Sequence, residues 1–239
     1  MSVLFVSDLH LDPSRPGITR LFLDLLAGEA RHAQALYLLG DLFEAWVGDD
    51  DAGDPATPVC EAIGALVRSG VPVFLMRGNR DFLYGPGIAG RSGATLLPDP
   101  CVIALFDEPV LLMHGDLLCT DDTAYQAFRA QVRDPAWQAA FLAQPLDARR
   151  AFAAQARAAS RAHQQGTMES IGDVVGDEVA STMARFGVRR LIHGHTHRPG
   201  VHVLDAGGRT AVRIVLGDWY EQGSLLRVDA DSEKPSALG

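Results

Sequence analysis

The chain has 239 residues, of which 47% are hydrophobic and 21% are charged, as in soluble globular proteins with a sizeable core. Its formal net charge of −9 argues against nucleic acid as a partner, because nucleic-acid binding requires a basic surface. The three cysteines show no CxxC spacing and fit free thiols in a reducing compartment. The apolar run at residues 3–6 is too short for a signal peptide or a membrane span, so we expect a cytoplasmic protein.

Six short apolar runs, bounded by glycine or aspartate, predict buried strands. They span residues 3–6, 35–39, 71–76, 110–113, 191–192 and 212–216. Apolar residues at helical spacing occur between the first three runs, at 18–25 and 59–67, and again at 175–186. This alternation predicts an α/β fold with parallel strand pairing in the first half. The tail beyond Ser232 has no periodicity and is expected to be frayed.

Residues 122–170 interrupt this alternation and predict a helical insertion of two or three short helices, separated near Pro135 and Pro145. Residues 123–170 contain six arginines and three acidic residues, a local charge of +3. Such a basic, aromatic-containing segment indicates contact with anionic groups or a membrane surface, or else only a solvated helical face. The length fits one domain with an insertion or two small domains. Because the motifs resume at Gly194, we expect a single domain over residues 1–239.

Five short motifs, each following an apolar run, carry side chains that bind divalent metals. They are Asp8-Leu9-His10, Gly40-Asp41-Leu42-Phe43-Glu44, Gly78-Asn79-Arg80-Asp81, His114-Gly115-Asp116 and Gly194-His195-Thr196-His197. The carboxyl ends of the strands in an α/β sheet lie along one edge, so we expect these motifs to meet there. Their potential ligands are Asp8, His10, Asp41, Asn79, His114, His195 and His197.

Each motif alone has an ordinary explanation, since Asp-x-His pairs are common in surface loops and Gly-Asp pairs in turns. The ordered set instead predicts a two-metal centre for hydrolysing phosphate esters or anhydrides. Imidazole and carboxylate ligands without thiolate fit Mn²⁺, Zn²⁺ or Fe²⁺ better than Mg²⁺ or Ca²⁺ alone. His193 is expected to be a core or outer histidine, and residues 49–51 a solvated acidic loop.

The order of these motifs resembles that of the calcineurin-like metallophosphoesterase superfamily. Nearly the whole chain is similar to its UDP-2,3-diacylglucosamine diphosphatase family, which acts in lipid A biosynthesis. Arg80 distinguishes this family from most of the superfamily, which has His at this position. The segments that carry the narrower resemblance are residues 40–46, 78–83, 114–116 with 118–122, and 192–199.

The resemblance implies a four-layer α-β-β-α sandwich with a helical lid insertion at about 122–170 and two Mn²⁺ ions. One ion would take Asp8, His10, Asp41 and His197, and the other Asp41, Asn79, His114 and His195. It also implies that water attacks the α-phosphorus of UDP-2,3-diacylglucosamine, giving UMP and 2,3-diacylglucosamine 1-phosphate (lipid X). Substrate contacts are implied for Asn79, Arg80, Asp122, Ser160 and His195. Gln164 and Thr167 depart from the Asn and Lys expected there.

Arg80, Asn79 and His195 are the expected catalytic residues. Arg80 would stabilise transition-state charge but, unlike His, could not protonate a leaving group, which fits an anhydride better than an alkyl ester. For the acyl chains we expect a lining of Trp46, Phe82, Tyr125, Phe128, Phe141 and Phe152, although these aromatics could instead only pack the lid on the core. Arg149, Arg150 and Arg157 would hold the lid near anionic lipid or pyrophosphate.

The lipid substrate implies a peripheral protein on the cytoplasmic face of the inner membrane, and we expect a monomer. Two other functions fit the motifs less well. One is a soluble nucleotide pyrophosphatase or phosphoprotein phosphatase with the same metal core, which the helical insertion disfavours. The other is a scaffold that has lost catalysis, which the complete ligand set and Arg80 disfavour.

Overall fold

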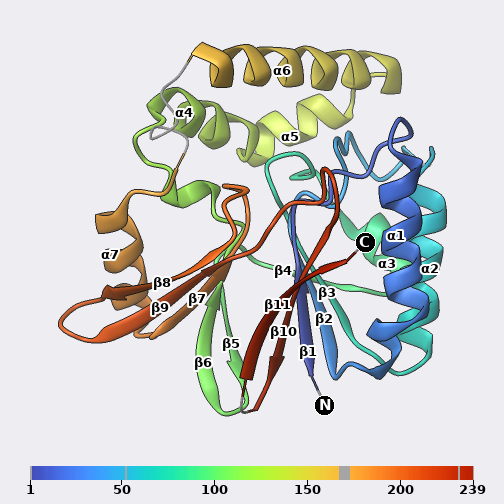
Figure 1. Ribbon diagram of the computed structural model, residues 1–239. Helices are drawn as coiled ribbons and strands as arrows, with labels where there is room; N and C mark the ends of the chain where they lie inside the picture. Colours follow the sequence, from blue (N-terminus) through green and yellow to red (C-terminus); the bar gives the residue numbers. More distant parts are fainter. Residues whose placement is uncertain (1, 52, 167–172, 231, 239) are drawn as a thin grey trace.

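The computed structural model describes residues 2–51, 53–166, 173–230 and 232–238, which form two β-sheets flanked by helices (Figure 1). The first sheet has the strand order β11-β10-β1-β2-β3-β4. Its strands are β1 (Val3–Val6), β2 (Ala35–Leu39), β3 (Val73–Met76), β4 (Thr95–Leu97), β10 (Gly223–Asp229) and β11 (Ser232–Leu238). The second sheet, in the order β5-β6-β7-β9-β8, contains β5 (Cys101–Leu105), β6 (Glu108–Leu112), β7 (Arg190–His193), β8 (Gly200–Asp205) and β9 (Thr210–Val215).

Alternate side chains of β1 point to opposite faces of the first sheet, as the period of a strand requires. Phe5 packs in the apolar layer between the two sheets, whereas Leu4 and Val6 pack under helices on the outer face. Those helices are α1 (Pro16–Ala27), α2 (Ala56–Arg68) and α3 (Pro86–Ser92).

The outer face of the second sheet is covered by α7 (Gly176–Phe186), whose Val179 and Met183 pack against Leu111 and Leu191. The layers are therefore helix, sheet, sheet and helix, which confirms the expected four-layer sandwich (Figure 1). Strands β1 to β4 pair in parallel, as do β6, β7 and β9. The carboxyl ends of these strands lie at the top of the view in Figure 1.

All six predicted strands are present, and the structure adds β4, β5, β8, β10 and β11. The expectation of a frayed tail was wrong. Residues 232–238 form β11, which pairs antiparallel with β10 along its whole length. An edge strand of this kind needs little apolar patterning and tolerates Pro235, so its sequence gives no clear strand signal.

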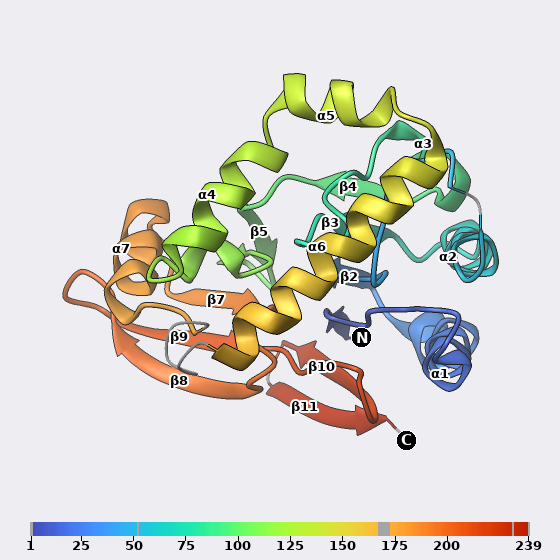
Figure 2. The same cartoon turned by 90° about the horizontal axis from the view of Figure 1, so that it is seen from above.

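Three helices lie above the carboxyl ends of the strands and are called the lid here (Figures 1 and 2). They are α4 (Thr123–Val132), α5 (Pro135–Leu142) and α6 (Leu146–Gly166). The expectation of short helices was wrong for α6, which has 21 residues. Its alanine-rich sequence has high helix propensity and no proline or internal glycine to end it. Among the described residues, no helix has the length and apolar character needed to cross a membrane.

Candidate metal centre and substrate cavity

The seven candidate ligands all follow strands that end at the edge beneath the lid. Asp8 and His10 follow β1, and Asp41 follows β2. Five of the seven have left-handed backbone angles, with φ of 56° at Asp8, 49° at His10, 54° at Asp41, 70° at His195 and 54° at His197. This conformation is costly for residues other than glycine, and it persists where surrounding structure holds the side chain in a fixed direction.

Gly40 shows how closely these loops approach one another. Its φ is +91°, and a Cβ atom added to it would lie 2.5 Å from Nδ1 of His114. Its carbonyl oxygen accepts a hydrogen bond from the backbone nitrogen of Asp8 at 3.1 Å. Only glycine fits this place, which brings the loops after β1, β2 and β6 together.

One group of potential ligands consists of Asp8, His10 and His197, whose ligand atoms all lie within 4.8 Å of one another. Nε2 of His10 and Nε2 of His197 are 3.3 Å apart. Oδ1 of Asp8 lies 3.9 Å from the first of these nitrogens and 3.4 Å from the second. These three side chains converge on one point from two sheets.

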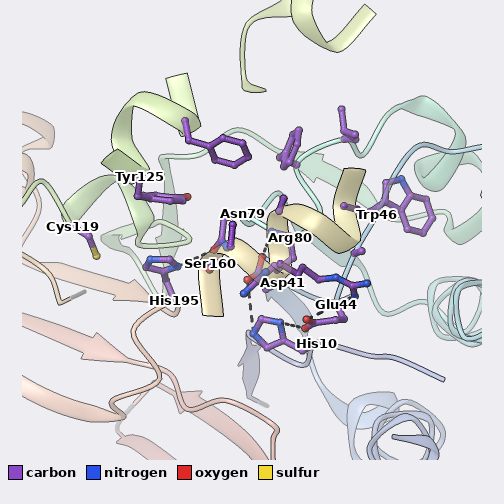
Figure 3. A pocket seen from close by; sticks show the side chains of 18 of the residues that line it. His10, Asp41, Glu44, Trp46, Asn79, Arg80, Cys119, Tyr125, Ser160 and His195 are labelled. Carbon is purple, nitrogen blue, oxygen red and sulfur yellow. Dashed lines mark hydrogen bonds and ion pairs between the residues drawn. The ribbon is translucent and has the colours of Figure 1, made fainter. Parts of the chain in front are cut away.

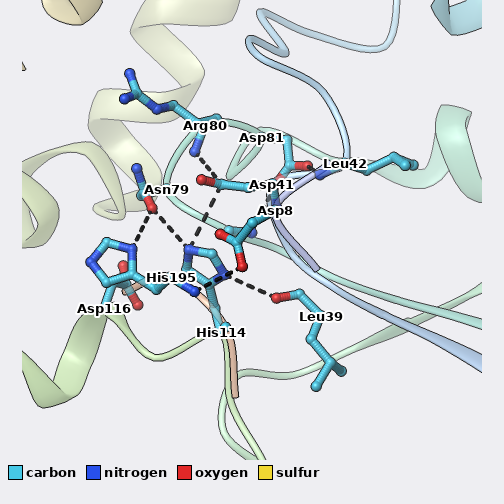
Figure 4. Close-up of polar contacts among 12 residues, drawn as sticks. Asp8, Leu39, Asp41, Leu42, Asn79, Arg80, Asp81, His114, Asp116 and His195 are labelled. Atoms are coloured by element: carbon cyan, nitrogen blue, oxygen red, sulfur yellow. Dashed lines mark hydrogen bonds and ion pairs between the residues drawn. The ribbon is translucent and has the colours of Figure 1, made fainter. Parts of the chain in front are cut away.

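A second group, Asp8, Asp41 and His114, meets the same criterion. Oδ1 of Asp41 lies 3.8 Å from Nε2 of His114, while its Oδ2 lies 3.8 Å from Nε2 of His10. Asp41 therefore faces both groups. Oδ1 of Asn79 extends the second group, at 2.8 Å from Nε2 of His114 and 2.9 Å from Nδ1 of His195 (Figure 4).

These residues fit divalent cations. Asp8 is fully buried, and its Oδ1 accepts no hydrogen bond within the described part of the chain. A buried carboxylate oxygen without a donor is costly, and a cation in the space that it shares with the imidazoles would compensate it. Nitrogen and oxygen donors without thiolate suit Mn²⁺ and related metals.

The electrostatics of the group agree with cation binding. Burial alone would lower the pKa of His114. The carboxylates of Asp41 and Asp8 outweigh this effect and raise the pKa to about 9. Burial would also lower the pKa of His197, but the carboxylates of Asp218 and Asp8 raise it to about 10. Burial and the neighbouring His114 lower the pKa of His195 to about 4. The protons attracted to His114 and His197 occupy positions that bound cations would take.

Two carboxylates outside the expected ligand set lie beside the Nδ1 atoms of candidate histidine ligands. Oε2 of Glu44 lies 3.1 Å from Nδ1 of His10, and Oδ2 of Asp218 lies 3.1 Å from Nδ1 of His197. Asp218 was not among the expected site residues, because it belongs to none of the five motifs. The available signal was its position, three residues after the end of β9, which matches the placement of the ligands after other strands.

Asp81 connects two of the motif loops through hydrogen bonds. Its Oδ1 accepts hydrogen bonds from the backbone nitrogens of Gly78 at 2.7 Å and Asp41 at 3.2 Å. Its Oδ2 accepts from the nitrogen of Leu42 at 2.7 Å and the hydroxyl of Tyr84 at 2.5 Å. Burial, together with the nearby Asp41, raises the pKa of Asp81 to about 6. This residue fixes two motif loops relative to each other.

A cavity of about 640 Å³ opens between the ligand groups and the lid (Figure 3). His10, Asp41, Asn79, Arg80, His195 and His197 line its polar end. The other expected contacts also line it, namely Trp46, Phe82, Asp122, Tyr125, Phe128, Phe141, Phe152 and Ser160. Tyr220, which the sequence did not indicate, lines the cavity and stacks on His10 with 5.2 Å between ring centroids. Thr167 and the side chain of Gln164 fall outside what the structure describes.

Arg149 and Arg150 hold the lid to acidic residues of the core and do not line the cavity, which corrects the expected position near pyrophosphate. Arg149, which is 2% exposed, donates hydrogen bonds to the Val47 carbonyl and to Asp50. Arg150 pairs with Asp51 at 2.7 Å. The acidic loop expected to be solvated is therefore where the amino-terminal part of α6 attaches to the core. The partners are 99 residues apart, and no sequence pattern links them. Arg157 does line the cavity, 3.9 Å from Glu44.

His193 is fully buried, as expected for a core histidine. Its Nδ1 donates a hydrogen bond to the Gly194 carbonyl at 2.8 Å. Burial lowers its pKa to about 3, so the ring stays neutral.

The calcineurin-like phosphoesterase family model matches residues 1–199, which include all seven candidate ligands. The fold and the site thus define a calcineurin-like phosphoesterase. Among curated proteins, UDP-2,3-diacylglucosamine hydrolase of Xanthomonas campestris pv. campestris (strain B100) is 62% identical, over 97% of this chain and 96% of its own. The protein of the same name from Stenotrophomonas maltophilia (strain R551-3) is 60% identical over the same shares. The chain belongs to the UDP-2,3-diacylglucosamine hydrolase family within the calcineurin-like phosphoesterases.

A solved structure described as a novel archaeal phosphodiesterase also aligns over 100% of both chains, with a TM-score of 0.47 and 11% identity.

Proposed function

We propose that this chain hydrolyses the pyrophosphate bond of UDP-2,3-diacylglucosamine, giving UMP and 2,3-diacylglucosamine 1-phosphate. The observation that carries the proposal is the composition of the cavity. One end holds imidazoles, carboxylates and Arg80, while aromatic side chains of the core and the lid line the rest. A substrate that joins a pyrophosphate to two acyl chains matches both ends. Curated relatives that are 60 to 62% identical bear the name of this activity.

The cofactor that we propose is a pair of Mn²⁺ ions. Asp8, His10, Asp41 and His197 would hold one ion, and Asp41, Asn79, His114 and His195 the other. Bound divalent cations supply Lewis acidity and a deprotonated water as nucleophile at neutral pH, and that water would attack the α-phosphorus. The support from this chain is the position of Asp41, whose two oxygens face the two groups.

Arg80 is the proposed catalytic residue for the phosphoryl oxygens. Its backbone nitrogen donates to Oδ1 of Asp41 at 2.7 Å, which fixes the residue beside the ligand groups, and its side chain lines the cavity (Figure 3). Guanidinium stays protonated and offers planar, paired donors to charge that develops on a phosphoryl group. Asn79 and His195 line the same end and are proposed to contact the substrate.

The apolar part of the cavity is proposed to hold the acyl chains. Phe128, 36% exposed, and Phe141, 4% exposed, both line it from the lid. Burial of acyl chain contributes about 0.8 kcal/mol per CH₂ group, so a chain of ordinary length supplies ample affinity. Tyr125 from the lid and Phe82 from the core would add to the lining for the acyl chains. Asp122 and Ser160 would contact the head group.

A lipid-linked UDP-sugar substrate also implies peripheral contact with the cytoplasmic face of the inner membrane. We propose this location, a single domain over residues 1–239 and a monomeric state. Nucleic acid is not among the proposed partners, given the net charge of −9.

The experiment that tests the function is UMP release from UDP-2,3-diacylglucosamine by the purified chain, with Mn²⁺ added or chelated. We expect release that depends on the metal. UDP-glucosamine without acyl chains is the matched substrate, and we expect it to be cleaved far more slowly. Equal turnover of the two substrates would instead support a soluble nucleotide pyrophosphatase, and no release from either would overturn the proposed hydrolase.

A further inference from the structure

The Nδ1 atoms of the candidate histidine ligands meet two different kinds of group, a carboxylate or a backbone carbonyl. Nδ1 of His10 meets the Glu44 carboxylate, as Figure 3 shows, and Nδ1 of His197 meets the Asp218 carboxylate, both at 3.1 Å. Nδ1 of His114 instead donates to the neutral carbonyl of Leu39 at 2.9 Å (Figure 4). The first ligand group thus has anionic support that His114 lacks.

We propose that Glu44 and Asp218 are positioning residues that make the two cation positions unequal. The position formed by Asp8, His10 and His197 binds the first divalent ion, and it binds that ion more tightly than the position formed with His114. This inference rests on the proposed metal-dependent function, and it adds an order of filling and two residues to it.

The physical reason lies in the ring nitrogens. A carboxylate beside Nδ1 favours the tautomer in which Nδ1 carries the proton, so that Nε2 is left free to bind an ion. In both His10 and His197 the Nε2 atoms face each other, 3.3 Å apart, and face Oδ1 of Asp8. The carboxylates therefore aim both nitrogens at one point and strengthen both as ligands.

The charges around the second group do not reverse this difference. Asp116 and Asp99 lie near His114, but two arginines face them. Arg129 has its Nε 2.8 Å from Asp116 and an Nη atom 3.5 Å from Asp99, and Arg133 has an Nη atom 4.0 Å from Asp116. Asn79 in the second group is neutral. Glu44 does face Arg157, at the longer distance of 3.9 Å. The difference between the groups therefore lies in what meets Nδ1, which is a carboxylate at 3.1 Å for His10 and His197 and a backbone carbonyl for His114.

Titration calorimetry of Mn²⁺ into the metal-free protein tests the proposal. We expect two binding events of different affinity in the unaltered chain. Glu44→Ala and Asp218→Ala should each weaken the tighter event by about 10- to 100-fold and leave the weaker one unchanged. Asp218→Asn should lose less, because it keeps an oxygen that can face Nδ1 of His197. Circular dichroism of each variant without metal verifies that it is folded.

Two controls assign the events. His114→Ala should remove the weaker event and keep the tighter one. Asp205→Ala removes an exposed carboxylate at the end of β8, and it should change neither event. The inference alone would be overturned if the two events had equal affinity, if Asp218→Ala and Glu44→Ala left both unchanged, and if UMP release still depended on metal. Absence of any Mn²⁺ binding would overturn the proposed metal dependence as well.

Discussion

Arg129 of helix α4 donates a hydrogen bond from Nε to Oδ2 of Asp116, which lies 2.8 Å away in the loop after β6. The same oxygen accepts from the hydroxyl of Tyr125 at 2.6 Å. Asp116 is fully buried and lies two residues after the candidate ligand His114. One carboxylate therefore fixes the first lid helix to the loop that carries a candidate metal ligand.

Arg129→Met should destabilise the protein by about 3 kcal/mol, because it removes the nearer partner of a buried carboxylate and leaves Asp116 only Arg133, 4.0 Å away. Urea unfolding followed by circular dichroism measures the change. Arg209→Met, an exposed arginine in the turn between β8 and β9, is the control and should stay within about 0.5 kcal/mol of the unaltered chain. If both variants unfold at the same urea concentration, the Asp116 contact does not hold the lid.

The Arg149–Asp50 contact should give a pH-dependent contribution to stability. The hydrogen bond from Arg149 lowers the pKa of Asp50 in the folded state. A lowered folded pKa stabilises the protein above the unfolded value of about 3.9, and that stability is lost as the pH falls through the folded pKa. The difference in unfolding free energy between the unaltered chain and Asp50→Asn should thus be constant from about pH 8 to 5 and shrink below about pH 4.

The size of this difference should be below about 1 kcal/mol, because the Asp50 side chain is 62% exposed. Arg149→Met should lower the unfolding free energy more, by about 2 kcal/mol. It also removes the hydrogen bond that Arg149 donates to the Val47 carbonyl at 2.6 Å. Unfolding in urea at each pH provides both values. The prediction would be contradicted if the difference in unfolding free energy between the unaltered chain and Asp50→Asn grew as the pH fell.

Much of the site could be predicted from the sequence because its residues follow strands. A strand that ends in Gly-Asp or Gly-Asn places that side chain at the sheet edge, wherever the strand lies in the chain. Asp218 follows β9 in the same way, in the pair Gly217-Asp218, but one Gly-Asp pair is common in turns, and its contact with His197 emerges only from the structure. Contacts such as Arg149 with Asp50 join distant residues through packing, which leaves no periodic signal.

The same reasoning explains which parts of the fold were missed. Central strands such as β2 are buried on both faces and appear as continuous apolar runs. Strand β8 lies at an edge of the second sheet and is largely exposed, including Val203 at 72%, so its pattern is ambiguous. The tail strand β11 is likewise an edge, and its pairing with β10 is long-range information.

Phe128→Ser should raise KM for the acylated substrate by about 10-fold or more while changing stability little. The side chain lines the cavity and is already 36% exposed, so its main loss is contact with substrate. The matched control is Phe186→Ser, which alters an aromatic side chain of 37% exposure on α7, away from the cavity. Equal KM values for the two variants would show that Phe128 does not contact the acyl chains.

Phe141 behaves differently because it is 4% exposed and packs on Trp137 and Phe152, with ring centroids 4.9 and 5.2 Å away. Phe141→Ala should cost about 3 to 5 kcal/mol of stability through the cavity it creates. Thermal unfolding measures this loss. A variant as stable as the parent would mean that the lid does not depend on this aromatic cluster.

Arg80→Met should lower kcat for UMP release by about 100- to 1,000-fold, since removing one preorganised donor to transition-state charge has this effect in other enzymes. Arg80→Lys keeps the charge but loses the planar pair of donors, and it should recover only part of the rate. Arg20→Met, which alters an exposed arginine of α1, is the control and should retain full activity. A kcat for Arg80→Met within a factor of three of the parent would remove Arg80 from the catalytic machinery.

Removal of metal should lower the stability of the folded chain. Ligand binding to the folded state contributes about 2.7 kcal/mol when the free ligand is at 100 times its Kd. For a chain of this size that energy corresponds to a rise in Tm on the order of 5–10 °C. Calorimetry with Mn²⁺ and then with excess chelator measures the shift.

The site-specific version of this measurement uses Asp8→Ala, because Asp8 belongs to both candidate ligand groups. Its metal-dependent rise in Tm should be largely lost, whereas Asp205→Ala should keep the whole shift. Asp8 also shows why the metal matters to the folded chain. Burial favours its neutral form, yet the imidazoles of His197, His114 and His10 lower its pKa, so the carboxylate stays charged and ready for a cation. An unchanged Tm rise in Asp8→Ala would place the bound metal elsewhere on the molecule.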